Sequence, residues 1–164
     1  MKNTLVDTDI LIHFLRGCGE AKNFLSSMLD RSQILCSSIT VAEIFAGIRP
    51  GEEEKTRALI DNLEVLDVTR EIAEKAGQYR RTIRSQVLEL DDCLIAATAF
   101  IHRSVLATGN GKHYPMRDIE VRVIACGSRH QSLQVKERLD AIYGKEKSAL
   151  GPRLGKLQAR SLPP

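Results

Sequence analysis

Apolar residues occur along the chain in two alternating patterns. Short apolar runs between polar residues predict buried strands, and these runs lie at 4–6, 33–37, 64–68, 105–107 and 120–125. Apolar residues three or four positions apart predict helices at 10–15, 21–29, 40–50, 52–62, 70–86 and 91–101. Strands that alternate with helices predict an α/β domain with three layers, α/β/α, around a mostly parallel central sheet of about five strands.

The pattern weakens after Gly127, and the charge balance changes there as well. Residues 128–164 hold eight Lys and Arg against three Asp and Glu, whereas residues 1–127 hold 16 against 18. We therefore predict a domain over 1–126 and a basic C-terminal segment over 127–164, with one amphipathic helix at 133–143 and a flexible tail. Its basic charge suits a nucleic acid or an acidic partner, and a solvated tail explains it equally well.

The composition of the chain argues against several classes of protein. The chain has no apolar run of about 18 residues, so it predicts no membrane-spanning helix. Its N-terminus enters the first strand without the layout of a signal peptide, which predicts a cytoplasmic protein. Aromatic residues are only 4% and Trp is absent, which argues against a platform that stacks bases. The four cysteines form no C-x-x-C pair, and we expect reduced, buried thiols rather than a zinc site or disulfides.

Two aspartates mark the point at which the first strand gives way to a helix. In an open parallel sheet this turn lies at the carboxyl edge, where such folds place their sites. Asp9 stands where a helix N-cap is expected, and a plain cap explains it. Asp7 stands at the end of the strand, where an acid needs a hydrogen-bond network, a cation or a catalytic task unless it is a solvated turn residue.

Two further acids follow at comparable places. Glu43 lies early in the helix after the second strand, although Thr40 and Glu43 also have the spacing of a capping box. Asp91 and Asp92 open a strongly apolar helix, and its dipole alone explains one of them. With Asp7 these acids would converge at one edge of the sheet and repel each other unless a cation neutralises them. Oxygen ligands predict Mg²⁺ or Mn²⁺, and such a site suits phosphodiester hydrolysis.

Four segments together resemble the PIN-domain ribonucleases, and most closely the VapC toxins of bacterial and archaeal toxin–antitoxin pairs. These segments are 6–12, 39–43, 92–97 and 108–114. Each motif is weak alone, but the four occur in the right order, and the resemblance runs from residue 3 to about 125. It implies a PIN-like fold and a Mg²⁺- or Mn²⁺-dependent endoribonuclease. By analogy it also implies a homodimer, an RNA substrate and a cognate antitoxin that blocks the site.

The resemblance assigns roles to particular residues. Asp7, Glu43 and Asp92 match the metal-binding acids of the family. The supporting positions are Thr8, which matches a small hydroxyl residue, Asp9, which matches a position that is usually Asn, and Thr108 and Asn110 in the loop after the fourth strand. The family often has a fourth acid in that loop, and this chain offers Asn110, His113 or the more distant Asp118. For contacts to RNA phosphates we expect Arg80, Arg81, Arg84 and Lys112, although a solvated helix face also explains the arginines.

The sequence also fits two other functional hypotheses. A haloacid-dehalogenase-type phosphatase also begins with a strand and Asp-x-Asp, which would make Asp7 the nucleophile and Asp9 the acid/base. Against it, no Lys stands in a supporting place before the Asp91–Asp92 pair, and a cap insert is absent. The other reading is a non-catalytic PIN-like binding module, which the missing fourth acid supports.

Overall fold

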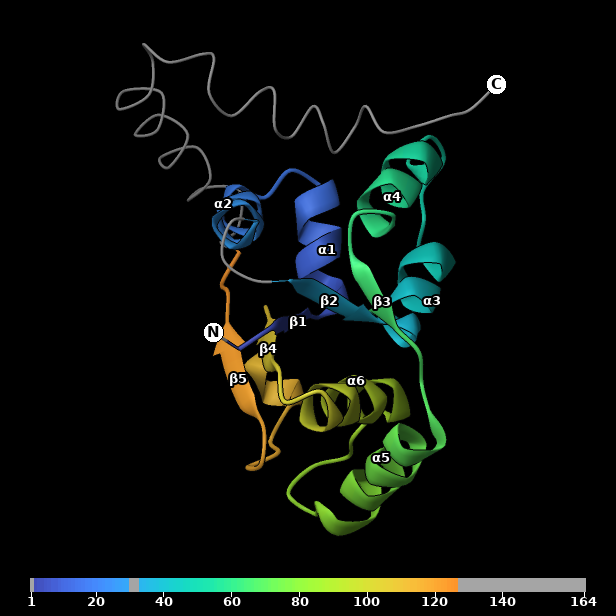
Figure 1. Ribbon diagram of the computed structural model, residues 1–164, viewed down its shortest axis with the longest axis vertical. Coiled ribbons are helices and arrows are strands. Elements are labelled where there is room, and N and C mark those ends of the chain that lie inside the picture. The colour runs from blue at the N-terminus through green and yellow to red at the C-terminus, as the bar shows by residue number, and fades with distance from the viewer. Residues whose placement is uncertain (1, 30–32, 127–164) are drawn as a thin grey trace.

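A five-stranded, all-parallel sheet forms the centre of the molecule (Figure 1). The computed structural model describes residues 2–29 and 33–126. The strands are β1 (Thr4–Val6), β2 (Ile34–Ser37), β3 (Glu64–Leu66), β4 (Val105–Thr108) and β5 (Glu120–Val123). Their order is β3-β2-β1-β4-β5, which places β1 at the centre and confirms the predicted parallel α/β sheet.

Helices cover both faces of this sheet, as the three-layer prediction requires (Figure 1). One layer contains α1 (Thr8–Leu15), α2 (Gly19–Met28), α3 (Ser38–Ala46) and α4 (Glu53–Ile60). The other contains α5 (Arg70–Thr82) and α6 (Leu90–Ile101). Successive side chains of a strand point to opposite faces, so Leu5 packs in the core with α5 and α6 while Val6 packs in the core with α1 and α2.

Most helix boundaries lie within two residues of the prediction, but α3 ends at Ala46 instead of residue 50, and α5 is also shorter than predicted. It ends at Thr82 instead of residue 86, because Ile83 has an extended backbone with φ −83° and ψ 112°. The following loop buries Leu88 and brings the Gln86 side-chain amide 2.7 Å from the carbonyl oxygen of Lys112. The loop before α6 is thereby joined to the short 3-10 helix η1 (Gly111–His113). The helix predicted at 133–143 lies outside the described residues.

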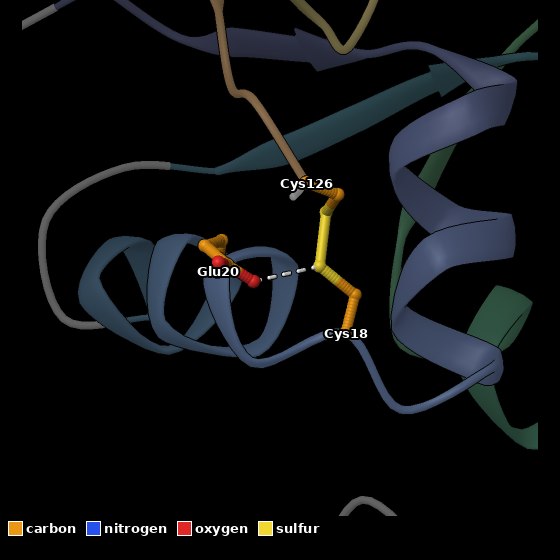
Figure 2. Close-up of side chains that lie close together, drawn as sticks. All are labelled: Cys18, Glu20 and Cys126. Atoms are coloured by element: carbon orange, nitrogen blue, oxygen red, sulfur yellow. Dashed lines mark hydrogen bonds between the residues drawn. A yellow bond between two sulfur atoms is a disulfide. The ribbon is translucent and has the colours of Figure 1, made fainter. Parts of the chain in front are cut away.

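The cysteine prediction holds for two residues and is wrong for the other two. Cys36 and Cys93 are buried free thiols, whereas Cys18 and Cys126 form a disulfide with a Cα–Cα distance of 6.4 Å (Figure 2). Cys18 lies between α1 and α2, and Cys126 lies just after β5. The two residues are 108 positions apart, so sequence spacing gave no sign of the pairing. None of the helices in residues 2–29 and 33–126 is long and apolar enough to span a membrane.

Candidate acidic site

Asp7 lies where β1 meets α1, and it rather than Asp9 is the N-cap of that helix. Its carboxylate accepts hydrogen bonds from the Thr8 backbone N–H and the Thr108 hydroxyl, both at 2.7 Å. The predicted cap at Asp9 is wrong because α1 begins at Thr8, directly after Asp7. Only 6% of Asp7 is exposed, so the alternative of a solvated turn acid is also wrong.

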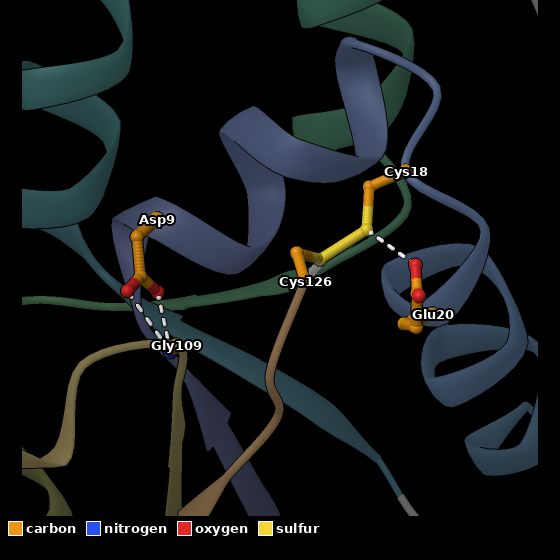
Figure 3. The surroundings of a disulfide bond; sticks show 5 residues. All are labelled: Asp9, Cys18, Glu20, Gly109 and Cys126. Atoms are coloured by element: carbon orange, nitrogen blue, oxygen red, sulfur yellow. Dashed lines mark hydrogen bonds between the residues drawn. A yellow bond between two sulfur atoms is a disulfide. The ribbon is translucent and has the colours of Figure 1, made fainter. Parts of the chain in front are cut away.

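Asp9 points out of the first turn of α1 toward the loop after β4 (Figure 3). Its two carboxylate oxygens lie 2.9 and 3.0 Å from the Gly109 backbone nitrogen, which donates to them. A Cβ at position 109 would lie 2.8 Å from Asp9 Oδ2, so only glycine permits this close approach. Asp9 thus joins the β4 loop to the first turn of α1.

Glu43 reaches the same place from α3, and it takes no part in a capping box. The N-cap of α3 is Ser37, whose hydroxyl accepts from the Ile39 N–H at 3.2 Å, so Thr40 already lies inside the helix. Thr40 is fully buried, and its hydroxyl has no hydrogen-bond partner among the described residues. The Glu43 carboxylate instead accepts a hydrogen bond from the Thr8 hydroxyl. Thr8 therefore connects Asp7 to Glu43, through its backbone and its side chain respectively.

The third acid, Asp92, comes from the first turn of α6. Its carboxylate lies 3.4 Å from the Tyr114 hydroxyl, which donates to it, and 3.3 Å from His113 Nδ1. Asp91 accepts from the Asp92 backbone N–H at 2.9 Å, and its carboxyl group interacts with that of Glu43. Sequence reasoning gave no site role to Tyr114, and it gave Asp91 none beyond the helix dipole and the acidic pair of the phosphatase alternative. The only signal for either was its place next to a predicted site residue.

Burial and mutual repulsion raise the pKa values of these acids. Burial, followed by the negative charge of Asp9, raises the pKa of Asp7 to about 6, although hydrogen bonds from Thr108, Tyr114 and Thr8 oppose the rise. Burial is also the main cause for Glu43, whose pKa rises to about 7 with help from Asp91 and Asp7. Burial likewise raises the pKa of Asp92, against the opposing effect of His113. A cation would relieve this crowding of carboxylates.

The other predicted residues divide between the site and its surroundings. Thr108 is buried and donates to Asp7, while its oxygen accepts from the Asn110 backbone N–H at 3.0 Å. Asn110 and Lys112 are exposed in the loop that carries His113. Asp118 is bound elsewhere, because its carboxylate lies 2.7 Å from Lys75 Nζ and 2.8 Å from the Tyr79 hydroxyl on α5. It therefore does not provide the fourth acid of the site.

The oxygen ligands of the three acids suit a hard divalent ion, but these oxygens do not lie in a tight cluster. Asp7, Glu43 and Asp92 offer only carboxylate oxygens, which Mg²⁺ and Mn²⁺ prefer. We considered groups of three residues drawn from the site's acids and His113. Within residues 2–29 and 33–126, no such group has all its ligand atoms within 4.8 Å of one another. A bound ion would have to bring these oxygens closer together.

Comparison with known proteins identifies the family. A model of the PIN domain matches residues 4–118. The chain belongs to the PIN-domain family. Ribonuclease VapC10 of Mycobacterium tuberculosis is 37% identical to it over 114 residues, which cover 68% of this chain and 86% of that protein. Ribonuclease VapC19 of the same species is 34% identical over 115 residues, with 68% and 92% covered. The resemblance to VapC-type PIN domains is therefore confirmed.

Solved structures of other proteins share the architecture. A chain of a toxin–antitoxin complex from Klebsiella pneumoniae is a match with a TM-score of 0.63 and 31% identity, over 71% of this chain and 95% of the matched chain. VapBC2 from Rickettsia felis, solved with a fragment of promoter DNA, gives a TM-score of 0.64 at 21% identity, over 73% and 97%. The second likeness shows the fold alone. Together they confirm the PIN-like α/β/α prediction.

Proposed function

We propose that this PIN-domain protein is a Mg²⁺- or Mn²⁺-dependent endoribonuclease and the toxin of a type II toxin–antitoxin pair. The observation that carries the proposal is the joining of acids from three separate elements. Thr8 links Asp7 to Glu43, and the Tyr114 hydroxyl lies between Asp7 and Asp92. The names of the relatives, which are ribonucleases, supply the substrate class. Family membership removes the ground for the phosphatase alternative.

Each residue has a distinct task in this proposal. Asp7, Glu43 and Asp92 hold the ion, and Asp9 and Thr108 fix the positions of Asp7 and the β4 loop. A divalent ion held there would supply positive charge near the scissile phosphate and would make a water molecule more nucleophilic. Asn110 and His113 occupy the loop where many relatives have a fourth acid, and His113 is already 3.3 Å from Asp92. They orient water or the phosphate.

Chelation and metal restoration test the proposal directly. The purified chain should cut RNA with Mn²⁺ or Mg²⁺, lose this activity in EDTA and regain it when the ion is added back. A preparation with Asp7→Asn, purified identically, controls for contaminating nucleases. Cleavage that persists in EDTA would contradict the proposed metal dependence. A chain that binds RNA and Mn²⁺ but never cuts would support the binding-module alternative.

We expect RNA to lie across the arginines at the end of α5 and in the loop that follows it. Arg80, Arg81 and Arg84 line a shallow open groove with Gln86. Burial raises the pKa of the Cys93 thiol and the charge of Arg80 opposes that rise, so Arg80 lies near the first turn of α6. The groove gathers three cationic side chains, and we expect them to bind phosphates of an RNA that reaches the acids.

Replacement of one arginine in this groove should weaken RNA binding. We expect Arg80→Gln to lower RNA affinity on the order of fivefold, as for one partly screened ion pair. The slope of log K against log salt should fall by about 0.7 for each phosphate that the protein no longer neutralises. Fluorescence anisotropy across a salt series, with Asp7→Asn present to prevent cutting, measures both. Arg16→Gln is the control, because Arg16 lies at the opposite end of α1 from Asp7 and should change neither value.

The Tyr114 hydroxyl should matter to the rate of cleavage. Tyr114→Phe removes a donor to the acids, and we expect about a tenfold lower rate because hydrogen bonds to charged groups contribute about 1.5 kcal/mol or more. Tyr79→Phe is a matched control, since both tyrosines are 4% exposed and the Tyr79 hydroxyl donates to Asp118 instead. The Mn²⁺ concentration for half-maximal activity should rise in Tyr114→Phe alone. Equal effects of both changes would indicate a general loss of packing.

A cognate antitoxin is the partner that the comparisons favour. One matched structure, from Klebsiella pneumoniae, is named a toxin–antitoxin complex, and another is VapBC2 from Rickettsia felis. An antitoxin arginine could pair with Asp7, Glu43 and Asp92 and thereby block the ion. The homodimer, the cytoplasmic location and the division of the chain at residue 126 stay predictions. A gene for a small partner next to this one, and co-purification of its product with this chain, would support the pairing.

A further inference from the structure

A second group of metal-binding side chains lies away from the acidic site. Cys18, Glu20 and Cys126 offer one ligand atom each, and all three atoms lie within 4.8 Å of one another (Figure 2). In the described part of the chain, this is the one group of three Cys, His, Asp or Glu residues that meets this spacing. It contains two sulfurs and one carboxylate, whereas the acidic site is dominated by oxygen donors.

Two segments that are distant in sequence build this group. Cys18 precedes α2 as its N-cap residue without a side-chain hydrogen bond to the helix, and Glu20 lies in the first turn of α2. Cys126 follows β5, which is an edge strand of the sheet. The group therefore bridges the connection between α1 and α2 and the chain that leaves β5 (Figure 3).

The position of Glu20 is better explained by a reduced form than by the disulfide. Glu20 Oε2 lies 3.1 Å from Cys18 Sγ. A sulfur in a disulfide has no proton, so it cannot donate to a carboxylate. A thiol can donate weakly, and a cation held by both groups would make the contact strongly favourable. Since all three groups are only half-buried, a small ion can reach them from solvent.

We propose that the reduced chain binds one thiophilic divalent cation of the Zn²⁺ class through Cys18, Glu20 and Cys126. Binding releases the two thiol protons, because thiolates are the ligands. A disulfide oxidant, such as oxidised glutathione, takes two electrons from the pair and leaves as two thiols, while Cys18 and Cys126 become joined. Oxidation thereby excludes the cation, so the site alternates between a metal and a disulfide.

The backbone spacing suits both forms. Zn²⁺–sulfur bonds are about 2.3 Å, so two thiolates on one tetrahedral ion lie roughly 3.8 Å apart. The Cα–Cα distance of 6.4 Å accommodates that separation after side-chain rotation. Three protein ligands leave a fourth position for water or another ligand. Either form ties the α1–α2 connection to Cys126, and the segment from 127 onward begins at that point.

Cobalt spectroscopy on the full-length chain tests the site. The chain is reduced with a phosphine, stripped of metal and titrated with Co²⁺, which reports thiolate ligands by charge-transfer absorption. We expect one equivalent of Co²⁺ to give this absorption, Zn²⁺ to displace it and excess Mg²⁺ to leave it unchanged. Prior oxidation to the disulfide should abolish it. Because the signal comes only from sulfur, Asp7→Asn should not change it, whether or not the chain proves to be a nuclease.

Variants assign the ligands. Cys126→Ser should remove the absorption, and Glu20→Gln, which keeps both thiols, should weaken Co²⁺ binding at least about tenfold, since even partners outside a ligand set contribute that much. Glu53→Gln is the matched control, because Glu53 also lies in the first turn of a helix, α4, and should bind as the parent does. The proposal is overturned if the reduced chain shows no thiolate absorption, if Cys126→Ser retains it through Cys36 or Cys93, or if the oxidised chain binds equally.

Discussion

Asp7→Asn should reduce RNA cleavage by at least about a thousandfold. The change keeps the size of the side chain and an oxygen for the Thr108 hydrogen bond, but it removes the negative charge that would hold the ion. Metal-ion catalysis contributes several kcal/mol to the stabilisation of the transition state, and each 1.36 kcal/mol is a factor of ten in rate. Single-turnover cleavage of a labelled RNA, over a range of Mn²⁺ concentrations, measures the loss.

Asp118→Asn is the matched control for this experiment. Asp118 is also an aspartate with hydrogen-bonded oxygens, but its partners are Lys75 and Tyr79 on α5. We expect its substitution to leave the cleavage rate within about twofold of the parent, because Asp118 does not reach the acids. If Asp7→Asn cut RNA at the parent rate, the three-acid site would be wrong. A large loss of cleavage in Asp118→Asn would instead indicate that Asp118 serves as the fourth acid of the site.

The fold was predictable because local and global signals agree in this chain. Short β-branched and leucine-rich runs such as 4–6 and 105–107 became adjacent parallel strands, and the intervening helices cover both faces. Once the sheet is parallel, its carboxyl edge must collect whatever follows β1 and β4. The meeting of Asp7 with Thr108, 101 residues later, follows from that topology.

Side-chain partners within the site were less predictable. A shift of the helix start by two residues exchanged the roles of Asp7 and Asp9, since cap preference is the same for either aspartate. Asp91 was assigned to the helix dipole, although its side chain also reaches Glu43. No periodicity in sequence encodes which of two adjacent acids turns toward another helix. The Cys18–Cys126 contact was missed for the same reason, because it depends on where β5 ends in space.

In the metal-free chain, the acidic site should lower stability as the pH rises. The pKa of Asp7 rises from 3.8 to about 6, and that of Glu43 from 4.5 to about 7. Between about pH 4 and 7 the folded state therefore holds protons that the unfolded chain releases, and the free energy of unfolding falls with increasing pH. Asp7 alone should lower the free energy of unfolding by on the order of 3 kcal/mol once the pH is above its folded pKa. Urea titrations in EDTA from pH 4 to 8 measure it.

At pH 8 and without metal, Asp7→Asn and Asp118→Asn should change the free energy of unfolding in opposite directions. Asp7→Asn removes a buried carboxylate with a raised pKa, so in EDTA at pH 8 it should be more stable than the parent even though it does not cut RNA. Asp118 has a lowered pKa, because its bonds to Lys75 and Tyr79 outweigh its burial, so its ionised form stabilises the fold at neutral pH. Asp118→Asn should therefore be less stable than the parent at pH 8, and this difference should vanish as the pH falls through the folded pKa of Asp118.

Saturating Mn²⁺ should stabilise the parent and not Asp7→Asn, because ligand binding to the folded state adds stability only where the site is intact. A destabilised Asp7→Asn at pH 8 without metal would mean that the carboxylate of Asp7 supports the fold, and the electrostatic crowding on which the metal site depends would be wrong.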